Sequence, residues 1–312
     1  MADGWGDIPV ALPHELVLPR QYPPASQLSR AGAKLRGQDL SGENLTRVDF
    51  TWANLSGANL EQAELTDAQL TNANLSGAVL TKANLTAASL RRANLLGAVL
   101  MSAILNQATL SQATLAGANL TEAELNDAKL TEADLSYTML RRASLAGANL
   151  TRACLYHANA SGAEFFGIDA TDTQLSCARL QSCDLRRANF LHTDLTRAIL
   201  TGANLNQVTL TGAIANDAKF QNANLTGAHI THSCLVAVNL QQATMIHTTL
   251  IDTDLSGANL QNSQLDHALI QGSRLQNVLW HQTSVKAARF CQVTGLSDSE
   301  TAWLRSQGAI IT

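Results

Sequence analysis

The chain has 312 residues, a net charge of −4 and an isoelectric point near 6.0, and only 4% of its residues are aromatic. This charge argues against a nucleic-acid-binding protein, for which a strongly basic face is expected. No apolar run has the length of a membrane-spanning helix and the N-terminus lacks a signal-peptide pattern, so we expect a cytoplasmic protein that does not bind membranes.

Residues 1–32 precede the regular pattern of the chain and contain all five of its prolines. If the pattern that follows is a stack of coils, its first coil exposes unpaired amides and an open apolar end. We therefore predict that residues 1–32 form an N-terminal cap. The alternative is a flexible arm that binds a partner, which the prolines together with Trp5 and Tyr22 would favour.

Residues 33–292 repeat every five residues without a slip, which gives 52 pentads. One position of the pentad is Leu in 39 of the 52 copies, and the position two residues before it is Ala in 35. Residues two apart point to the same side of an extended segment, so each pentad is predicted to be a very short strand with these two side chains inward. Of 19 glycines, 14 occupy the fifth position, which indicates a repeated turn there.

The repeated motif, A-[N/D]-L-x-x as in residues 53–57, resembles the pentapeptide-repeat family, including members that are abundant in cyanobacteria. The resemblance covers about five-sixths of the chain. It implies an all-β solenoid, namely a right-handed, four-sided (quadrilateral) β-helix of about 13 coils, or roughly 60 Å at the spacing of neighbouring strands. We number the four faces of each coil from the pentads centred on Leu35, Leu40, Leu45 and Phe50. The Asn and Asp residues that point outward are expected to form hydrogen-bonding ladders between coils.

At some inward positions Leu is replaced by a larger or a smaller residue, and neighbouring replacements keep the total volume of the core nearly constant. Phe165 stands between Ala160 and Ala170 in the column of inward residues, and Phe220 follows Ala215. A large ring flanked by small side chains keeps the core volume nearly constant, so we interpret these positions as packing and not as a cofactor pocket.

Cysteine and histidine provide the candidate reactive groups. The five cysteines are an odd number without metal-binding spacing, which suits a reducing compartment. Cys183 is at an inward position and is predicted to lie in the core, whereas Cys154, Cys177 and Cys234 are at outward positions and are either neutral surface thiols or reactive ones. Two histidines, His247 and His267, are stacked at one corner, but no third ligand completes a metal site.

Several apolar residues interrupt an outer surface that is otherwise rich in hydroxyl and amide groups. On the second face of coils 3 to 6 the outward residues include Val79, Val99 and Met139, and an adjoining corner carries two tyrosines. Such a group either consists of scattered surface residues or marks a protein-docking site. We call it the apolar patch, and its members are Val79, Leu96, Val99, Met101, Tyr137, Met139 and Tyr156.

Residues 293–312 follow the end of the repeat. Ser297 and Glu300 have the spacing of a capping box, in which each side chain satisfies a free amide at the start of a helix. We predict a short helix whose Trp303 and Leu304 cover the last coil, and Gly308 is a natural stop.

The sequence contains no P-loop, dinucleotide-binding, metalloprotease or nucleophile-elbow motif, so no catalytic residue, cofactor or metal is predicted. We expect a non-catalytic protein–protein interaction scaffold or regulator, either a monomer or a side-on homodimer, that presents rigid faces to a protein partner. The alternative that the family resemblance implies is a DNA mimic that binds DNA gyrase, although acidic and basic coils alternate along this chain. A third possibility is an ice- or carbohydrate-binding surface built on Thr columns such as Thr131, Thr151 and Thr171.

Overall fold

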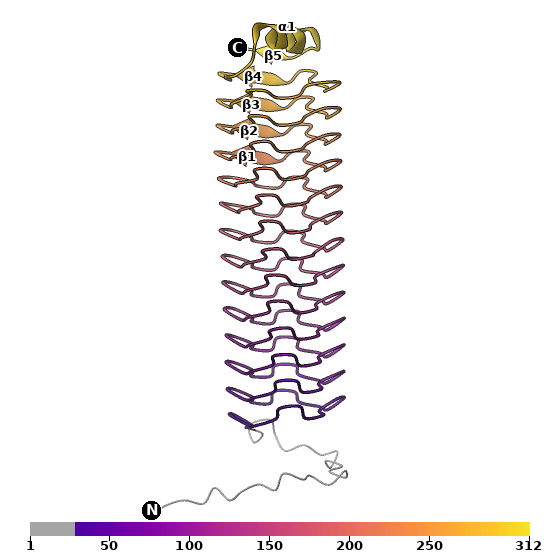
Figure 1. Cartoon of the computed structure of the whole chain (residues 1–312). Helices are drawn as coiled ribbons and strands as arrows, with labels where there is room; N and C mark the ends of the chain where they lie inside the picture. Colours follow the sequence, from indigo (N-terminus) through magenta and orange to yellow (C-terminus); the bar gives the residue numbers. More distant parts are fainter. Residues whose placement is uncertain (1–28) are drawn as a thin grey trace, which may run out of the picture.

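The computed structural model describes residues 29–312, which form one straight column of stacked coils (Figure 1). Parallel bridges join each outward residue to the residue 20 positions later, from the Ser29–Asp49 pair to the Arg274–Thr294 pair. Four pentads therefore complete one coil, as the sequence predicts. Most of the predicted N-terminal cap, residues 1–28, lies outside the described residues.

The core is a continuous column of the inward side chains. From Ala53 onward the small and large inward residues are almost all fully buried, with Leu positions such as Leu55 and Leu120 at 0% exposure. Burying each such Leu stabilises the fold by about 1.5–3 kcal/mol before entropy is counted. Leu35 and Leu40 are only partly buried because no described coil lies beneath them.

Backbone hydrogen bonds connect every coil to its neighbours in both directions. The Leu55 amide donates to the carbonyl of Asn74 at 2.7 Å, and the Asn74 amide donates to the carbonyl of Ala53 at 2.9 Å. Because the chain turns directly after each such bridge, most pentads contain a single bridged residue and not a strand. Within residues 29–312, regular parallel strands form only on the fourth face near the C-terminus; the first four are β1 (His229–Thr231), β2 (Thr249–Ile251), β3 (Leu269–Gln271) and β4 (Arg289–Cys291).

The fifth residue of the pentad has a left-handed backbone whether or not it is glycine. At non-glycine residues of this kind, including Trp52 and Tyr137, φ lies between +50° and +61°. The side chain of an outward Asn or Asp supports the turn, as when Asn54 Oδ1 accepts a hydrogen bond from the Ser56 amide at 3.1 Å. Outward Asn and Asp side chains also form hydrogen bonds to one another between neighbouring coils, for example from Asn94 to Asn74 at 3.3 Å. These bonds are fewer than the bonds to the turn, so the outward Asn and Asp side chains act largely within their own pentad.

The C-terminal end of the column is formed by α1 (Asp298–Ser306) and β5 (Ile310–Ile311), as Figure 1 shows. Leu304 is fully buried and belongs to the same apolar cluster as the coils. β5 extends the parallel sheet of the fourth face by pairing with β4, an element that the sequence did not predict. Within residues 29–312, no helix is long and apolar enough to cross a bilayer.

Candidate functional site

The apolar patch lies on the second face and on both of its corners. Leu96, Tyr137 and Tyr156 are at the corner with the first face, and Met101, 40% exposed, is at the corner with the third. A parallel ladder connects Val79, Val99, Asn119 and Met139 in consecutive coils. Met139 is 43% exposed, and the valines are half-buried between their neighbours. The structure thus places three predicted patch residues in one straight line on a rigid backbone.

The corner of the patch contains an aromatic cluster. The rings of Tyr137 and Tyr156 meet edge to face with centroids 5.7 Å apart, and Tyr137 stacks on the His157 imidazole at 5.4 Å. His157 also meets Tyr156 edge to face at 4.3 Å. We call Tyr137, Tyr156 and His157 the aromatic cluster. His157 is not among the patch residues predicted from the sequence, although it stands 20 residues after Tyr137 and therefore directly follows it in the same corner column.

The surroundings of Tyr137 leave its ring open to solvent. Gly97 and Gly117 occupy the same corner position in the two preceding coils, and a Cβ atom added to either would meet nothing within 4 Å. Tyr137 is 59% exposed and Leu96 is 53% exposed. Aromatic side chains beside bare backbone present a large contact area at a small cost in conformational entropy, which is a property of protein-binding surfaces.

Other exposed apolar side chains do not join the patch. Phe166 projects from the corner of the third and fourth faces, and the Arg186 guanidinium lies 5.5 Å from its ring centre. Ile214 is on the first face, and Leu279 lies seven coils beyond Met139 on the second. Trp52, 69% exposed, is at a corner of the N-terminal coils.

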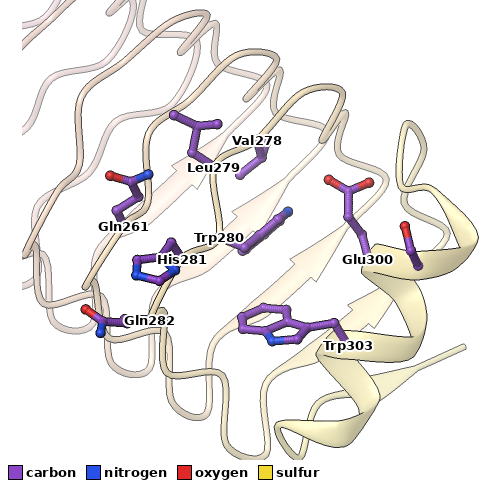
Figure 2. A pocket seen from close by; sticks show the side chains of 9 residues that line it. Gln261, Val278, Leu279, Trp280, His281, Gln282, Glu300 and Trp303 are labelled. Carbon is purple, nitrogen blue, oxygen red and sulfur yellow. The ribbon is translucent and has the colours of Figure 1, made fainter.

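A cleft of about 380 Å³ separates the last full coil from α1. Figure 2 shows Trp280 reaching from the coil toward α1 and Trp303 reaching from α1 toward the coil. The Glu300 carboxylate accepts hydrogen bonds from the Ser297 amide (2.8 Å) and hydroxyl (2.6 Å), and the Ser297 hydroxyl oxygen accepts from the Glu300 amide (3.2 Å). The Glu300 carboxylate at this cleft is therefore already engaged in capping α1. Trp280 Nε1 has no hydrogen-bond partner among the described residues.

A second cleft of about 380 Å³ lies at the corner of the fourth and first faces, between the bare corners at Gly212 and Gly272. His232 Nε2 is 3.5 Å from an Asp252 carboxylate oxygen. The Ser233 hydroxyl is buried and donates to the carbonyl of Leu210, so it is not directed into the cleft as a nucleophile.

The remaining candidate groups are dispersed. His247 and His267 are stacked with ring centroids 5.1 Å apart, yet in the part of the chain that the structure covers no three His, Cys, Asp or Glu side chains are placed to hold a metal ion. Cys183 is buried, whereas three other cysteines that the sequence places outward are partly exposed: Cys154, Cys177 and Cys234.

Solved structures of several proteins resemble the column. One is a trypsin-treated variant of QnrB1, a plasmid-mediated fluoroquinolone resistance protein, at 14% identity, 64% coverage of this chain and 89% of that chain, with a TM-score of 0.44. Another is HetL, involved in heterocyst differentiation regulation in the cyanobacterium Nostoc sp. strain PCC 7120. The match has 28% identity, covers 82% of this chain and 91% of HetL, and has a TM-score of 0.28. A third is Rfr23 of the cyanobacterium Cyanothece 51142, at 30% identity, 32% and 63% coverage and a TM-score of 0.17.

No curated protein matches the chain. A family model does: the model for pentapeptide repeats, in eight copies, matches overlapping segments that run without a gap from residue 31 to residue 272. These segments cover well over half of the 312 residues. Within the same residues, the bridges define a coil of 20 residues. The chain therefore belongs to the pentapeptide-repeat family and folds as a right-handed β-helix solenoid, which confirms the resemblance seen in the sequence.

Proposed function

We propose that this protein is a non-catalytic scaffold or regulator that binds a partner protein through the apolar patch. The observation that carries this proposal is the aromatic cluster, in which exposed Tyr137, Tyr156 and His157 rings are packed against one another beside the exposed Met139. Aromatic residues and Met are enriched at protein interfaces, and a few such residues contribute most of the binding energy.

Rigidity of the patch supports this proposal. The backbone at Tyr137 and Met139 is hydrogen-bonded to the coils on both sides. The Tyr137 amide donates to the Tyr156 carbonyl at 2.9 Å, and the Met139 amide donates to the Ala118 carbonyl at 3.0 Å. A surface that is already ordered loses little conformational freedom when a partner binds, so more of the contact energy appears as affinity.

We further infer that the column has about 13 coils and that α1 caps its C-terminal end. The complete burial of Leu304 supports the cap, because this side chain covers the end of the core. A covered C-terminal end does not support association through that end, whereas the patch on the side of the column supports a monomer that binds a different protein or a side-on homodimer.

The proposal is tested by affinity capture from the source organism with the full chain and two variants. Tyr137→Ala combined with Met139→Asp alters the patch, and Trp52→Ala combined with Phe166→Ala removes exposed aromatic rings elsewhere. We expect the same partner to be recovered with the wild-type chain and the control variant, and to be lost with the patch variant. Equal recovery with all three chains, at unchanged circular dichroism, would contradict the proposal.

A homodimer through the patch gives a different result in the same set of proteins. In that case, light scattering of the purified wild-type chain would show twice the monomer mass, and the patch variant would be monomeric.

A further inference from the structure

The charges on the outer surface are sorted by face. On the second face, the only charged outward residues after Asp39 are Arg179 and Lys219, and both are basic. On the third face, which is next to it, the charged outward residues are all acidic: Glu64, Glu124, Glu164 and Asp184. The second face therefore differs in sign from its neighbour although the whole chain is acidic.

The second face is also ordered along its length. One parallel ladder runs from Val79 through Met139 to Arg179 and Lys219, with one outward residue per coil. Val79, Val99 and Met139 are in coils 3 to 6, and the two cations are in coils 8 and 10. Ile199, between the two cations, and Leu279, in coil 13, are further apolar residues of this ladder outside the patch. At about 4.8 Å per coil, the seven coil steps from Val79 to Lys219 span about 34 Å.

The two cations are available to a partner. Arg179 and Lys219 are exposed, and neither forms an ion pair within residues 29–312. Nearby arginines at the corners differ, because Arg142 lies 3.7 Å from Glu122 and Arg197 lies 3.9 Å from Asp217. A pair of unneutralised cations in line with an apolar patch complements carboxylates on a binding partner.

We propose that the partner docks along the second face as one elongated protein segment with apolar side chains at one end and carboxylates at the other. This inference rests on the proposed function and adds the chemistry and the direction of the partner segment. Its apolar end lies on the patch and its acidic end lies on Arg179 and Lys219. The 34 Å span corresponds to about 22 residues of α-helix or about 10 residues of extended chain.

Peptide display on the full chain tests this proposal. A library of random peptides of about 25 residues is selected for binding, and the affinity of enriched peptides is then measured for wild-type chain and variants by fluorescence anisotropy. Arg179→Glu with Lys219→Glu reverses the cations, and Val99→Asp with Met139→Asp alters the patch. Lys129→Glu with Arg289→Glu is the matched control, since these residues are an exposed Lys and an exposed Arg on the fourth face.

We expect enriched peptides to carry apolar residues at one end and Asp or Glu at the other. Reversal of the two cations should weaken binding about tenfold at about 50 mM salt and much less at about 500 mM, because salt screens exposed charges. The control variant should change affinity less than about twofold, and the patch variant should abolish binding at either salt concentration.

Three outcomes would overturn the proposal. If the patch variant loses binding while the cation-reversed variant keeps it, the docking function stands but its acidic partner does not. If enriched peptides bind all variants equally, both the function and this inference fail. If a single-stranded oligonucleotide probe displaces the peptides and its own binding requires Arg179 and Lys219, the face recognises nucleic acid instead of an acidic protein segment.

Discussion

The thiol of Cys183 donates a hydrogen bond to the backbone carbonyl of Ala160, 2.9 Å away, and both residues are buried in the core. Burial raises the pKa of the Cys183 thiol to about 12, because a thiolate is poorly solvated there. Since the thiolate is the reactive form, we predict that Cys183 does not react in the folded chain.

Alkylation with iodoacetamide followed by mass spectrometry checks this prediction. The other four cysteines are partly exposed, so we expect four labels on the native chain and five after unfolding. A label on Cys183 under native conditions would show that the core opens at this coil.

Phe165 and Phe166 are adjacent in sequence and opposite in environment. Phe165 is 1% exposed and shares its coil with the small inward residues Ala160 and Ala170, while Phe166 is 40% exposed. Only a residual apolar cavity of about 10 Å³ remains beside Phe165, so the ring compensates for the small residues. Phe165→Ala should lower the free energy of unfolding by about 3–5 kcal/mol.

The matched control is Phe166→Ala, which should cost less than about 1 kcal/mol because it removes an exposed cation–π contact with Arg186. Urea denaturation followed by circular dichroism measures both effects. Equal losses in the two variants would mean that the inward and outward assignment is wrong at this coil.

Asp184 and Arg186 form a two-point ion pair on the surface. Arg186 Nε donates to Asp184 Oδ1 at 2.8 Å and Nη2 donates to Oδ2 at 2.6 Å. The hydrogen bond from this guanidinium lowers the pKa of Asp184. A carboxyl with a lowered pKa stabilises the fold above its unfolded value of about 3.9, and the contribution is lost as the pH falls through the lowered pKa.

Asp184→Asn should therefore lower the melting temperature near neutral pH, and the difference from the wild-type chain should narrow below about pH 4. Glu164→Gln on the same face is a suitable control, because Glu164 has no ion pair among residues 29–312. If the melting temperature of Asp184→Asn differs from that of the wild-type chain by the same amount at every pH, the ion pair is not the cause of the difference.

The capping box at Ser297 and Glu300 stabilises a short helix. An isolated helix of nine residues is marginal in water, so α1 depends on its cap and on burial of Leu304. We predict that Ser297→Ala costs about 1 kcal/mol and that Ser297→Gly costs a few tenths.

Hydrogen exchange resolves the effect along the chain. Amides of α1 and β5 should exchange faster in Ser297→Ala while those of the coils stay unchanged. Faster exchange throughout the column would show that α1 is essential to the whole fold.

The sequence alone was sufficient to predict the core, because burial depends on a strict period of five that fixes which side chains point inward. It did not predict the left-handed backbone at Trp52 or Tyr137, since neither residue favours that conformation and the coils above and below impose it. β5 was missed for a similar reason: two residues carry no periodic signal, and only the edge of β4 orders them.

The candidate site was predicted in part. Single apolar residues such as Met139 stand out against a polar surface, so their position in the repeat was sufficient to find them. His157 was missed because histidine is not an apolar residue, and its contribution comes from stacking against Tyr137 across coils. Whether outward side chains lean toward one another depends on rotamers at the corners, which a period of five does not specify.

The 20-residue register between bridges has a consequence for how such a chain can change its length. Insertion or loss of 20 residues adds or removes one complete coil, and every outward residue stays on its own face. Loss of a single pentad between Met139 and Arg179 would instead turn everything beyond it by a quarter revolution, moving Arg179 and Lys219 off the face that Met139 occupies. Duplications and deletions in this chain are therefore compatible with its surface only in multiples of four pentads.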